Sequence, residues 1–356
     1  MIPSVAQAFG IDAFSAGKIV WLYMLPYGLA ALLYGPLARN VEGKKILLYC
    51  LGGLTLANIA SGLAPNILFL FSARILAGLS GAGIIPLSLI LIAKASPPHQ
   101  RGRRVGGFFS ITFASSLLGL FLSGLVYWRW IFLLPAIGAA LVCLGICLWP
   151  PDFSFRREKL KFNYLQAFSD RRVFRLFVYI FAISFLYHGV RQWLGVYFFT
   201  IYGLEQFLIS ALLTTISLSG IFGESLGGIL SDRVGRRRII NIGAGLMLTS
   251  LVALLFKNVT FSLFAIMFVW GLGWTFNHAA ISTFLTDLPQ AHLYESASLN
   301  SSIRFLSGGL GALLGGILAR RSFNLEFMFF AFCLFVLFIV GKKLILEGNL
   351  NGRLAR

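Results

Sequence analysis

Charged side chains are scarce in this sequence of 356 residues. Asp, Glu, Lys and Arg together make up 12% of it, which is about half the share of a typical soluble protein. Hydrophobic residues, in contrast, reach 58%. A soluble fold of this size could not bury so much apolar surface. The composition therefore argues against a soluble globular protein and predicts an integral membrane protein.

Patterns that support covalent chemistry are also missing. The four cysteines all lie within apolar runs, so they indicate neither a disulfide framework nor a zinc-binding knuckle. Only four histidines occur, and the sequence has no nucleophile elbow and no phosphate-binding loop. We therefore expect no enzyme, no ATP-driven pump, no metal and no cofactor.

Acidic residues are the rarer charge, with 12 Asp and Glu against 30 Lys and Arg. Nucleic-acid-binding proteins gather basic residues on one face of a polar domain. Here the basic residues occupy short loops between apolar runs, which is the pattern of membrane topology. The expected partners are thus the lipid bilayer and a small-molecule substrate, and not nucleic acid.

Eleven apolar runs approach the length of about 20 residues that a membrane-spanning helix requires. The predicted fold class is an all-α membrane protein with eleven transmembrane helices. The predicted spans are 16–38, 45–64, 67–93, 105–126, 130–149, 174–201, 208–230, 238–256, 260–286, 293–319 and 323–346.

Basic residues predict how these spans are oriented. The loops at 39–45, 94–104, 152–175, 232–238 and 342–356 hold 22 of the 30 Lys and Arg, whereas the opposite loops hold five. Loops rich in Lys and Arg stay on the cytoplasmic side. The asymmetry predicts a multi-pass protein of the plasma (inner) membrane, with its N-terminus outside and its C-terminus in the cytoplasm.

A weak internal repeat divides the chain. A shift of 192 to 193 residues aligns Phe9–Asp12 with Tyr202–Glu205, and Gly35 with Gly228. Parallel repeats of this kind build many secondary transporters, whose substrate sites lie where the two halves meet.

The repeat predicts a domain organisation. Residues 1–149 form an N-terminal half, 150–172 a basic cytoplasmic linker, and 173–356 a C-terminal half. The span at 174–201 has no counterpart in the first half, because that counterpart would precede Met1. We therefore expect five spans plus six, with the first helix of a twelve-helix protein absent from this chain.

The segment GGILSDRVGRRR at 227–238 carries the clearest motif. It resembles the signature loop G-x-L-x-D-R-x-G-R-R/K-R/K of the major facilitator superfamily nearly letter for letter. The resemblance implies a monomeric bundle of two pseudo-repeated halves, a secondary active transporter that moves a small solute by alternating access and is coupled to protons. It also implies that the loop acts as a conformational gate. The gate residues are Gly228, Asp232, Arg233, Gly235, Arg236 and Arg237.

Other matches to this family are partial. In the first-half copy of the loop, GPLARNVEGKK at 35–45, Arg39 replaces the aspartate and Glu42 replaces the turn glycine, so we expect this copy to be degenerate. Arg74 begins a segment similar to the R-x-x-Q-G element of the fourth helix. A glycine pattern at 106–124 resembles the antiporter motif, with Leu120 in place of its proline. These matches favour the drug or sugar efflux branch.

Ionisable residues inside spans are costly in lipid and therefore mark candidate sites. Glu224 is either a proton carrier or a structural hydrogen-bond partner. Arg304 is expected to pair with Glu224 or Asp232. Arg74 has a substrate or proton role, or its side chain extends outward to the membrane surface, or it bonds to backbone carbonyls.

Two helix faces complete the predicted path. His188, Arg191 and Gln192 share one face, and Trp270, Trp274, Asn277 and His278 share another, because residues three, four, seven or eight apart lie on the same side of a helix. The full set for a substrate or proton path is Arg74, His188, Arg191, Gln192, Glu224, Trp274, Asn277, His278 and Arg304.

Several functional alternatives remain at the level of sequence. The cationic faces favour an anionic or acceptor-rich substrate, whereas the efflux resemblance favours drugs or sugars. The histidines could instead satisfy backbone carbonyls while the tryptophans anchor the helices at the interface. Finally, the degenerate first copy and the absent helix are compatible with a membrane protein that transports nothing and serves assembly or sensing.

Overall fold

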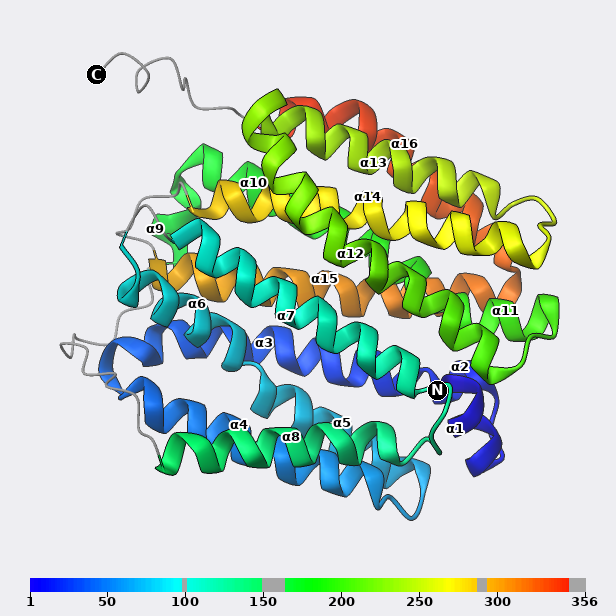
Figure 1. The fold of residues 1–356 in the computed structure, drawn as a ribbon, viewed down its shortest axis with the longest axis horizontal. Helices are drawn as coiled ribbons and strands as arrows, with labels where there is room; N and C mark the ends of the chain where they lie inside the picture. Colours follow the sequence, from blue (N-terminus) through cyan, green and yellow to red (C-terminus); the bar gives the residue numbers. More distant parts are fainter. Residues whose placement is uncertain (98–100, 149–163, 287–292, 346–356) are drawn as a thin grey trace.

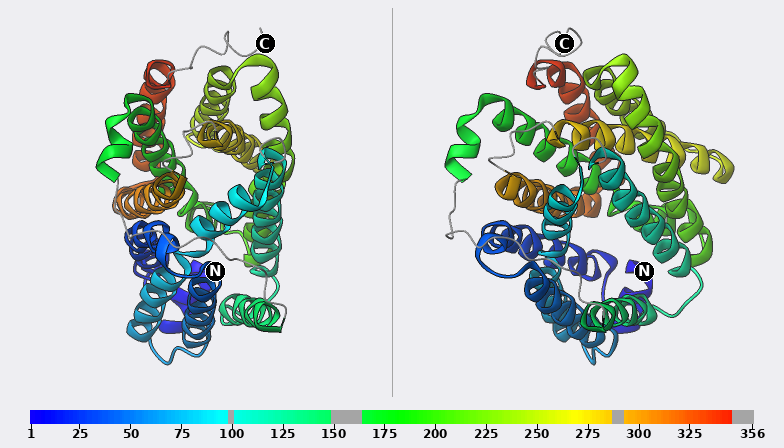
Figure 2. Two further views of the ribbon diagram at one scale, coloured as in Figure 1. Left: turned by 90° about the vertical axis from the view of Figure 1, so that its left-hand side faces the viewer. Right: turned by 60° about the vertical axis from the view of Figure 1, so that its left-hand side comes forward.

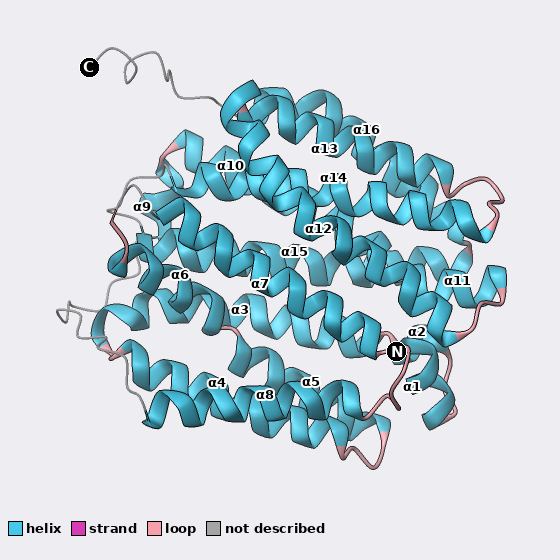
Figure 3. Cartoon of the chain, viewed as in Figure 1, coloured by secondary structure: helices cyan, strands magenta, loops and turns pink. Residues whose placement is uncertain are grey.

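The described part of the structure is entirely helical. The structure is a computed structural model that describes residues 1–97, 101–148, 164–286 and 293–345, and these ranges contain no strand (Figure 3). The first eight helices are α1 (Ile2–Phe9), α2 (Ala13–Ala16), α3 (Lys18–Asn40), α4 (Gly43–Gly62), α5 (Ile67–Gly81), α6 (Ile84–Ala95), α7 (Arg101–Leu122) and α8 (Trp130–Leu148). The others are α9 (Tyr164–Ser169), α10 (Arg171–Arg191), α11 (Leu194–Tyr202), α12 (Gln206–Val234), α13 (Arg236–Ala253), α14 (Thr260–Thr286), α15 (Leu293–Arg321) and α16 (Phe323–Leu344).

Nine of the eleven predicted spans are long and apolar enough to cross a membrane within the described residues. The other two predictions, 105–126 and 238–256, fall on α7 and α13, which are helical but begin with clusters of arginine. The apolar part of α7 covers only Gly107–Leu122. Both helices nevertheless run alongside the others in the bundle (Figure 1).

The helices form two groups that pack against each other through two main helix pairs. In the N-terminal group, α3 packs on α5 and α4 packs on α5 and α8; in the C-terminal group, α14 packs on α12 and α13, and α10 packs on α15 and α16. Between the groups, α15 lies along α3 and α12 lies along α7. The view along the helices shows α15 (orange) beside α3 (blue) (Figure 2, left).

Connections gather at the two ends of the bundle. α3 ends, and α10 begins, at the left end in Figure 1, whereas α1, α2 and α11 lie at the right end. At the right end one turn occurs twice. α1 ends at Gly10 and α11 ends at Gly203, each with φ 63°, a conformation that favours glycine because it has no Cβ. The two glycines are 193 residues apart, which is the offset of the sequence repeat.

A tryptophan marks the break between α10 and α11, which together form one span. Trp193 Nε1 donates to the carbonyl oxygen of Ala312 at 2.8 Å. Its ring fills the space beside Gly17 and Gly316, where an added Cβ would lie 2.3 and 2.4 Å from ring carbons. The indole therefore joins α11 to the beginning of α3 and to the C-terminal half of α15.

Glycines bring the helices into close contact, because lipid provides no hydrophobic drive for helices to associate. A Cβ on Gly311 would lie 2.2 Å from the Phe185 carbonyl oxygen, and on Gly315 2.3 Å from that of Gly189. These two glycines pack α15 against α10, within the C-terminal group. Gly308 of α15 instead faces Met24 of α3. Of these three glycines on α15, therefore, only Gly308 lies between the two groups.

We predict that Gly311→Ala destabilises the protein. The new methyl group would overlap the Phe185 carbonyl, and overpacking typically costs about 1–3 kcal/mol. The matched control is Gly138→Ala on α8, where nothing lies within 4 Å of the added Cβ. Thermal unfolding in detergent should show a midpoint several degrees lower for Gly311→Ala only. Equal midpoints for both variants would contradict this packing.

Candidate transport site

Aromatic and basic side chains from three helices meet midway along the C-terminal group. Tyr187 of α10 stacks on Trp274 of α14, with ring centroids 4.0 Å apart and planes 9° from parallel. His188 meets the same tryptophan edge-on at 5.8 Å. The Arg304 guanidinium of α15 lies 5.9 Å from the Trp274 ring, at the outer limit of a cation–π contact.

A buried carboxylate–imidazole pair lies next to this cluster. Glu224 Oε1 of α12 is 2.7 Å from His278 Nδ1 of α14, and both side chains are 9% exposed. The two helices approach closely because Gly223 faces Thr275, where an added Cβ would lie 2.0 Å from the hydroxyl oxygen. Gly223 thus allows α12 to approach α14 closely enough for the Glu224 carboxylate to reach the His278 imidazole.

Two phenylalanines of α7 cover this pair. The rings of Phe109 and Phe113, one turn apart on α7, meet the His278 ring edge-on at 4.9 and 5.7 Å. Sequence patterns do not distinguish these two residues, because phenylalanine is abundant throughout the chain. Their i, i+4 spacing on a helix that faces α12 is the signal that could have done so.

Arg304 does not form the predicted ion pair with Glu224. Its Nε donates to Asn300 Oδ1, one turn earlier on the same helix, at 2.9 Å. The partner of Glu224 is His278, although Glu224 remains close enough for its charge to act on Arg304. The side chain of Asp232, the other expected partner, lies outside the described residues. Arg304 Nη1 and Nη2 are buried and have no hydrogen-bond partner among the described residues.

The remaining residues of the two predicted faces have different surroundings. Asn277 is fully buried, accepts from the Tyr179 hydroxyl at 2.7 Å and donates to the Gly273 carbonyl at 3.0 Å. It therefore ties α10 to α14, and its path role stays a prediction. Gln192 Nε2, at the break after α10, is buried with no partner among the described residues. Arg191 lies against the Tyr187 hydroxyl.

Arg74 is not brought to this cluster. Its Nη1 donates to Asn58 Oδ1 at 3.3 Å and its Nε to the Ile19 carbonyl at 3.4 Å. Its guanidinium also lies over Tyr23 and Phe132, 4.6 and 5.2 Å from their centroids. All of these partners belong to the N-terminal group, and the path role expected for Arg74 stays a prediction. The alternative, in which it bonds to backbone carbonyls, fits its contacts.

The signature loop forms the turn between α12 and α13. Gly235 has φ 93°, which favours glycine. Arg236 lies over the Phe284 ring at 5.1 Å, and Arg237 Nε donates to the Ile345 carbonyl. Both arginines thereby join the turn to neighbouring helices of the same group. Arg233 is exposed, Gly228 has open space beside it, and the gate role predicted for Asp232 concerns a side chain outside the described residues.

Comparison with known proteins identifies the family. The family model of the Major Facilitator Superfamily matches residues 1–311. The chain belongs to the major facilitator superfamily. This is a family of transporters, not of enzymes, as the composition and motifs predict.

Relatives and solved structures agree with this assignment. An uncharacterized MFS-type transporter of Bacillus subtilis, YwfA, is 26% identical over 329 residues, which is 89% of this chain and 79% of that protein. Multidrug resistance protein 3 of the same organism is 21% identical, over 90% of this chain and 76% of that protein. The crystal structure of the human organic anion transporter MFSD10 has a TM-score of 0.75 at 16% identity, over 95% of this chain and 88% of that one.

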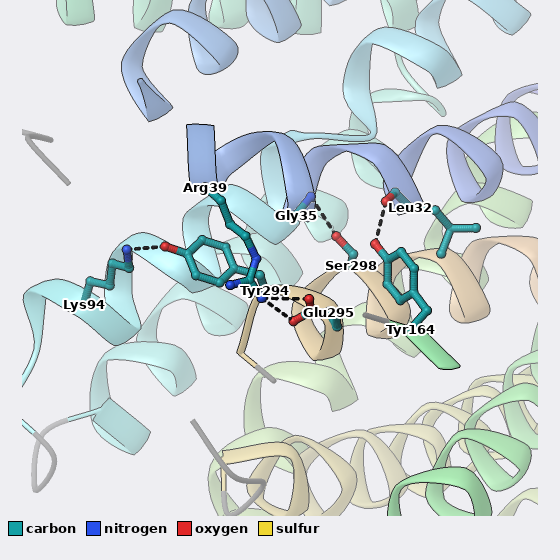
Figure 4. A network of polar contacts seen from close by, with 8 residues as sticks. All are labelled: Leu32, Gly35, Arg39, Lys94, Tyr164, Tyr294, Glu295 and Ser298. Carbon is teal, nitrogen blue, oxygen red and sulfur yellow. Dashed lines mark hydrogen bonds and ion pairs between the residues drawn. The ribbon is translucent and has the colours of Figure 1, made fainter. Parts of the chain in front are cut away.

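Within this facilitator fold, the first copy of the loop is not merely degenerate. Arg39, which replaces the aspartate, donates through Nη2 to both carboxylate oxygens of Glu295 on α15, at 2.7 and 2.8 Å (Figure 4). The side chains are 10% and 0% exposed. Arg39 also lies over the Tyr294 ring, whose hydroxyl accepts from Lys94 of α6. The substitution therefore creates an ion pair between the two groups.

Hydrogen bonds extend this contact along α3. The backbone N–H of Gly35 donates to Ser298 Oγ at 2.9 Å, and the Tyr164 hydroxyl of α9 donates to the Leu32 carbonyl at 2.5 Å (Figure 4). Burial raises the pKa of Tyr164 to about 12, so the hydroxyl keeps its proton. Tyr164 belongs to the predicted linker, whose residues 150–163 lie outside the described ranges. The described end of the linker thus packs on the junction of α3 and α15.

We predict that charge reversal at this pair separates α3 from α15 and that a double reversal restores the contact. In Arg39→Glu, Glu295 would be buried without its partner, which costs roughly 3–5 kcal/mol. The readout is the rate at which a maleimide labels a cysteine at position 298, which is fully buried here, in a background without the natural cysteines. Labelling should rise about tenfold or more.

The double variant Arg39→Glu/Glu295→Arg should label at nearly the original rate. As a matched control, Lys45→Glu reverses a charge in the exposed Lys45–Glu42 pair, whose side chains are 59% and 46% exposed, and should change little. Unchanged labelling in Arg39→Glu would show that the ion pair does not hold the two groups together.

Proposed function

We propose that this protein is a proton-coupled secondary transporter that moves a small solute by rocking its N-terminal and C-terminal helix groups against each other. The observation that carries the coupling is the Glu224–His278 pair, buried in the C-terminal group and covered by Phe109 and Phe113 of α7. The 2.7 Å separation places the carboxylate and the imidazole within ion-pair distance.

Physical chemistry links this pair to the motion. A single unpaired charge in the middle of a bilayer is costly, whereas a carboxylate and an imidazole that share a proton have no net charge. Proton exchange with either side requires water to reach the pair, and the two phenylalanines block that approach. If α7 moves with the N-terminal group, the pair is uncovered in one state and covered in the other. Binding or release of the proton then depends on the conformation.

The orientation follows from the basic ends of the helices. The ends of α3 and α6 and the beginning of α10 lie at the left end of the bundle in Figure 1, and these helix ends carry Arg39, Lys94 and Arg171. We infer that this end faces the cytoplasm of a cell whose plasma membrane contains the protein, with the N-terminus outside, the C-terminus inside and the monomer as the working unit. In that orientation the Arg39–Glu295 pair closes the cytoplasmic side.

Glu224→Gln tests the coupling. The amide keeps the size and hydrogen-bonding capacity of the side chain but cannot exchange the proton. In proteoliposomes that enclose a pH-sensitive dye, a panel of organic anions, sugars and lipophilic cations is screened for solute-driven proton flux. We expect Glu224→Gln to lose at least tenfold of that flux while keeping solute counterflow, which needs no net proton movement.

Glu326→Gln provides the control, because Glu326 is a fully buried acid on α16, away from α7. It should retain both proton flux and counterflow. Proton flux that survives in Glu224→Gln would refute the coupling role of the pair. Proton flux and counterflow absent for every solute in the unaltered protein would instead support the assembly or sensing role.

A further inference from the structure

The Arg304 guanidinium is only partly satisfied. Nε donates to Asn300, whereas Nη1 and Nη2 are buried and meet no acceptor among the described residues. A buried donor without an acceptor costs about 1–3 kcal/mol, and more when the group is charged. These two nitrogens project as a planar fork, which is the geometry that binds both oxygens of a carboxylate or similar oxyanion.

The position of Arg304 places this fork where the two helix groups meet. Gly308, one turn later on the same face of α15, touches Met24 of α3 and His188 of α10: an added Cβ would lie 2.4 Å from Met24 Cε and 2.8 Å from His188 Cδ2. Motion of α3 relative to α15 would therefore open the surroundings of Arg304. Arg304 and His188 both lie in the C-terminal group, so they would stay together during this motion.

The charges around Arg304 favour an anion. Arg191 and Arg304 both lie near His188, and Glu224 is the acid whose charge acts on Arg304. Of the acids on α12 and α15 whose side chains are described, Glu224 is paired with His278 and Glu295 with Arg39, whereas Glu326 is a buried acid on α16. A cationic solute would therefore meet no free carboxylate among the described side chains of α12 and α15, whereas an anion would meet an unsatisfied guanidinium.

Aromatic surface and a further donor complete the site. Trp274 lies within cation–π range of Arg304 and stacks on Tyr187. Gln192 Nε2, on the same helix face as His188, is a second buried donor without a partner among the described residues. A flat apolar surface beside a cationic fork suits a solute that has both an aromatic or apolar body and an anionic group.

We propose that Arg304 binds the carboxylate, sulfonate or phosphate group of the transported solute, while Trp274 contacts its apolar body. This proposal names the substrate class and rests on the proposed transport function. Its test measures binding alone, so proton coupling could fail while this proposal stands.

The experiment measures thermal stabilisation of the purified full chain in detergent by paired probes. Each pair contains an organic anion and its neutral counterpart, such as 2-naphthoate and 2-naphthamide, and the set includes a sulfonate, a phosphate monoester and the cation tetraphenylphosphonium. We expect at least one anion, and no neutral counterpart, to raise the unfolding midpoint. Arg304→Gln should weaken the apparent affinity for that anion about 10- to 100-fold, as expected for a lost charge-assisted bidentate contact.

Two further variants separate binding from folding. Arg304→Lys keeps the charge but not the fork and should weaken binding less than Arg304→Gln. Arg320→Gln, an exposed arginine on the same helix, should bind the anion like the unaltered protein. The proposal is overturned if no anion of the set stabilises the protein, if a neutral probe or the cation stabilises it as well as the anions, or if Arg304→Gln binds the anion unchanged.

Discussion

A charged side chain inside the membrane must be paired or hydrogen-bonded within the protein, because lipid offers it no partner. The positions of these pairings determine which helices are held together. Arg74 is enclosed by Asn58, a backbone carbonyl and two aromatic rings within one helix group. The Arg39–Glu295 pair crosses between the groups. A charge that is paired within one helix group holds that group together. A charge that is paired across the two groups holds them together only while the ion pair is formed.

Close backbone contact makes these pairings possible. Glycines on α12 and α15 reduce the separation from α14 and α10, so short side chains can meet. The Glu224–His278 pair depends on this approach. The phenylalanines of α7 then reach the imidazole. The close helix contact and the ionisable pair thus occur at the same place in the bundle. For this reason we propose that the Glu224–His278 pair couples proton movement to the motion of the helices.

Hydropathy and loop charge predicted most of the spans, because a lipid-spanning helix must be apolar over its whole length. The turn at Gly235 was predictable from the signature letters. The side-chain contacts between helices were not predictable from the sequence. Helices in lipid are apolar on both their packed and their lipid-facing sides, so hydrophobic periodicity does not identify the face that packs inside the protein. The hydrogen bonds of Arg74 to Asn58 and of Asn277 to Tyr179 therefore could not be read from the sequence. Arg39 looked like a lost motif residue but has an acid partner 256 positions away.

The central claim is that the two helix groups rock and that protonation of the Glu224–His278 pair biases this motion. The most direct measurement is the distance between spin labels at positions 45 and 238, exposed sites at the same end of the bundle on α4 and α13, with the natural cysteines replaced. In lipid nanodiscs the account predicts two distance populations whose ratio changes with pH, and a fixed ratio in Glu224→Gln. A single distance at every pH, or a pH response that persists in Glu224→Gln, would contradict it.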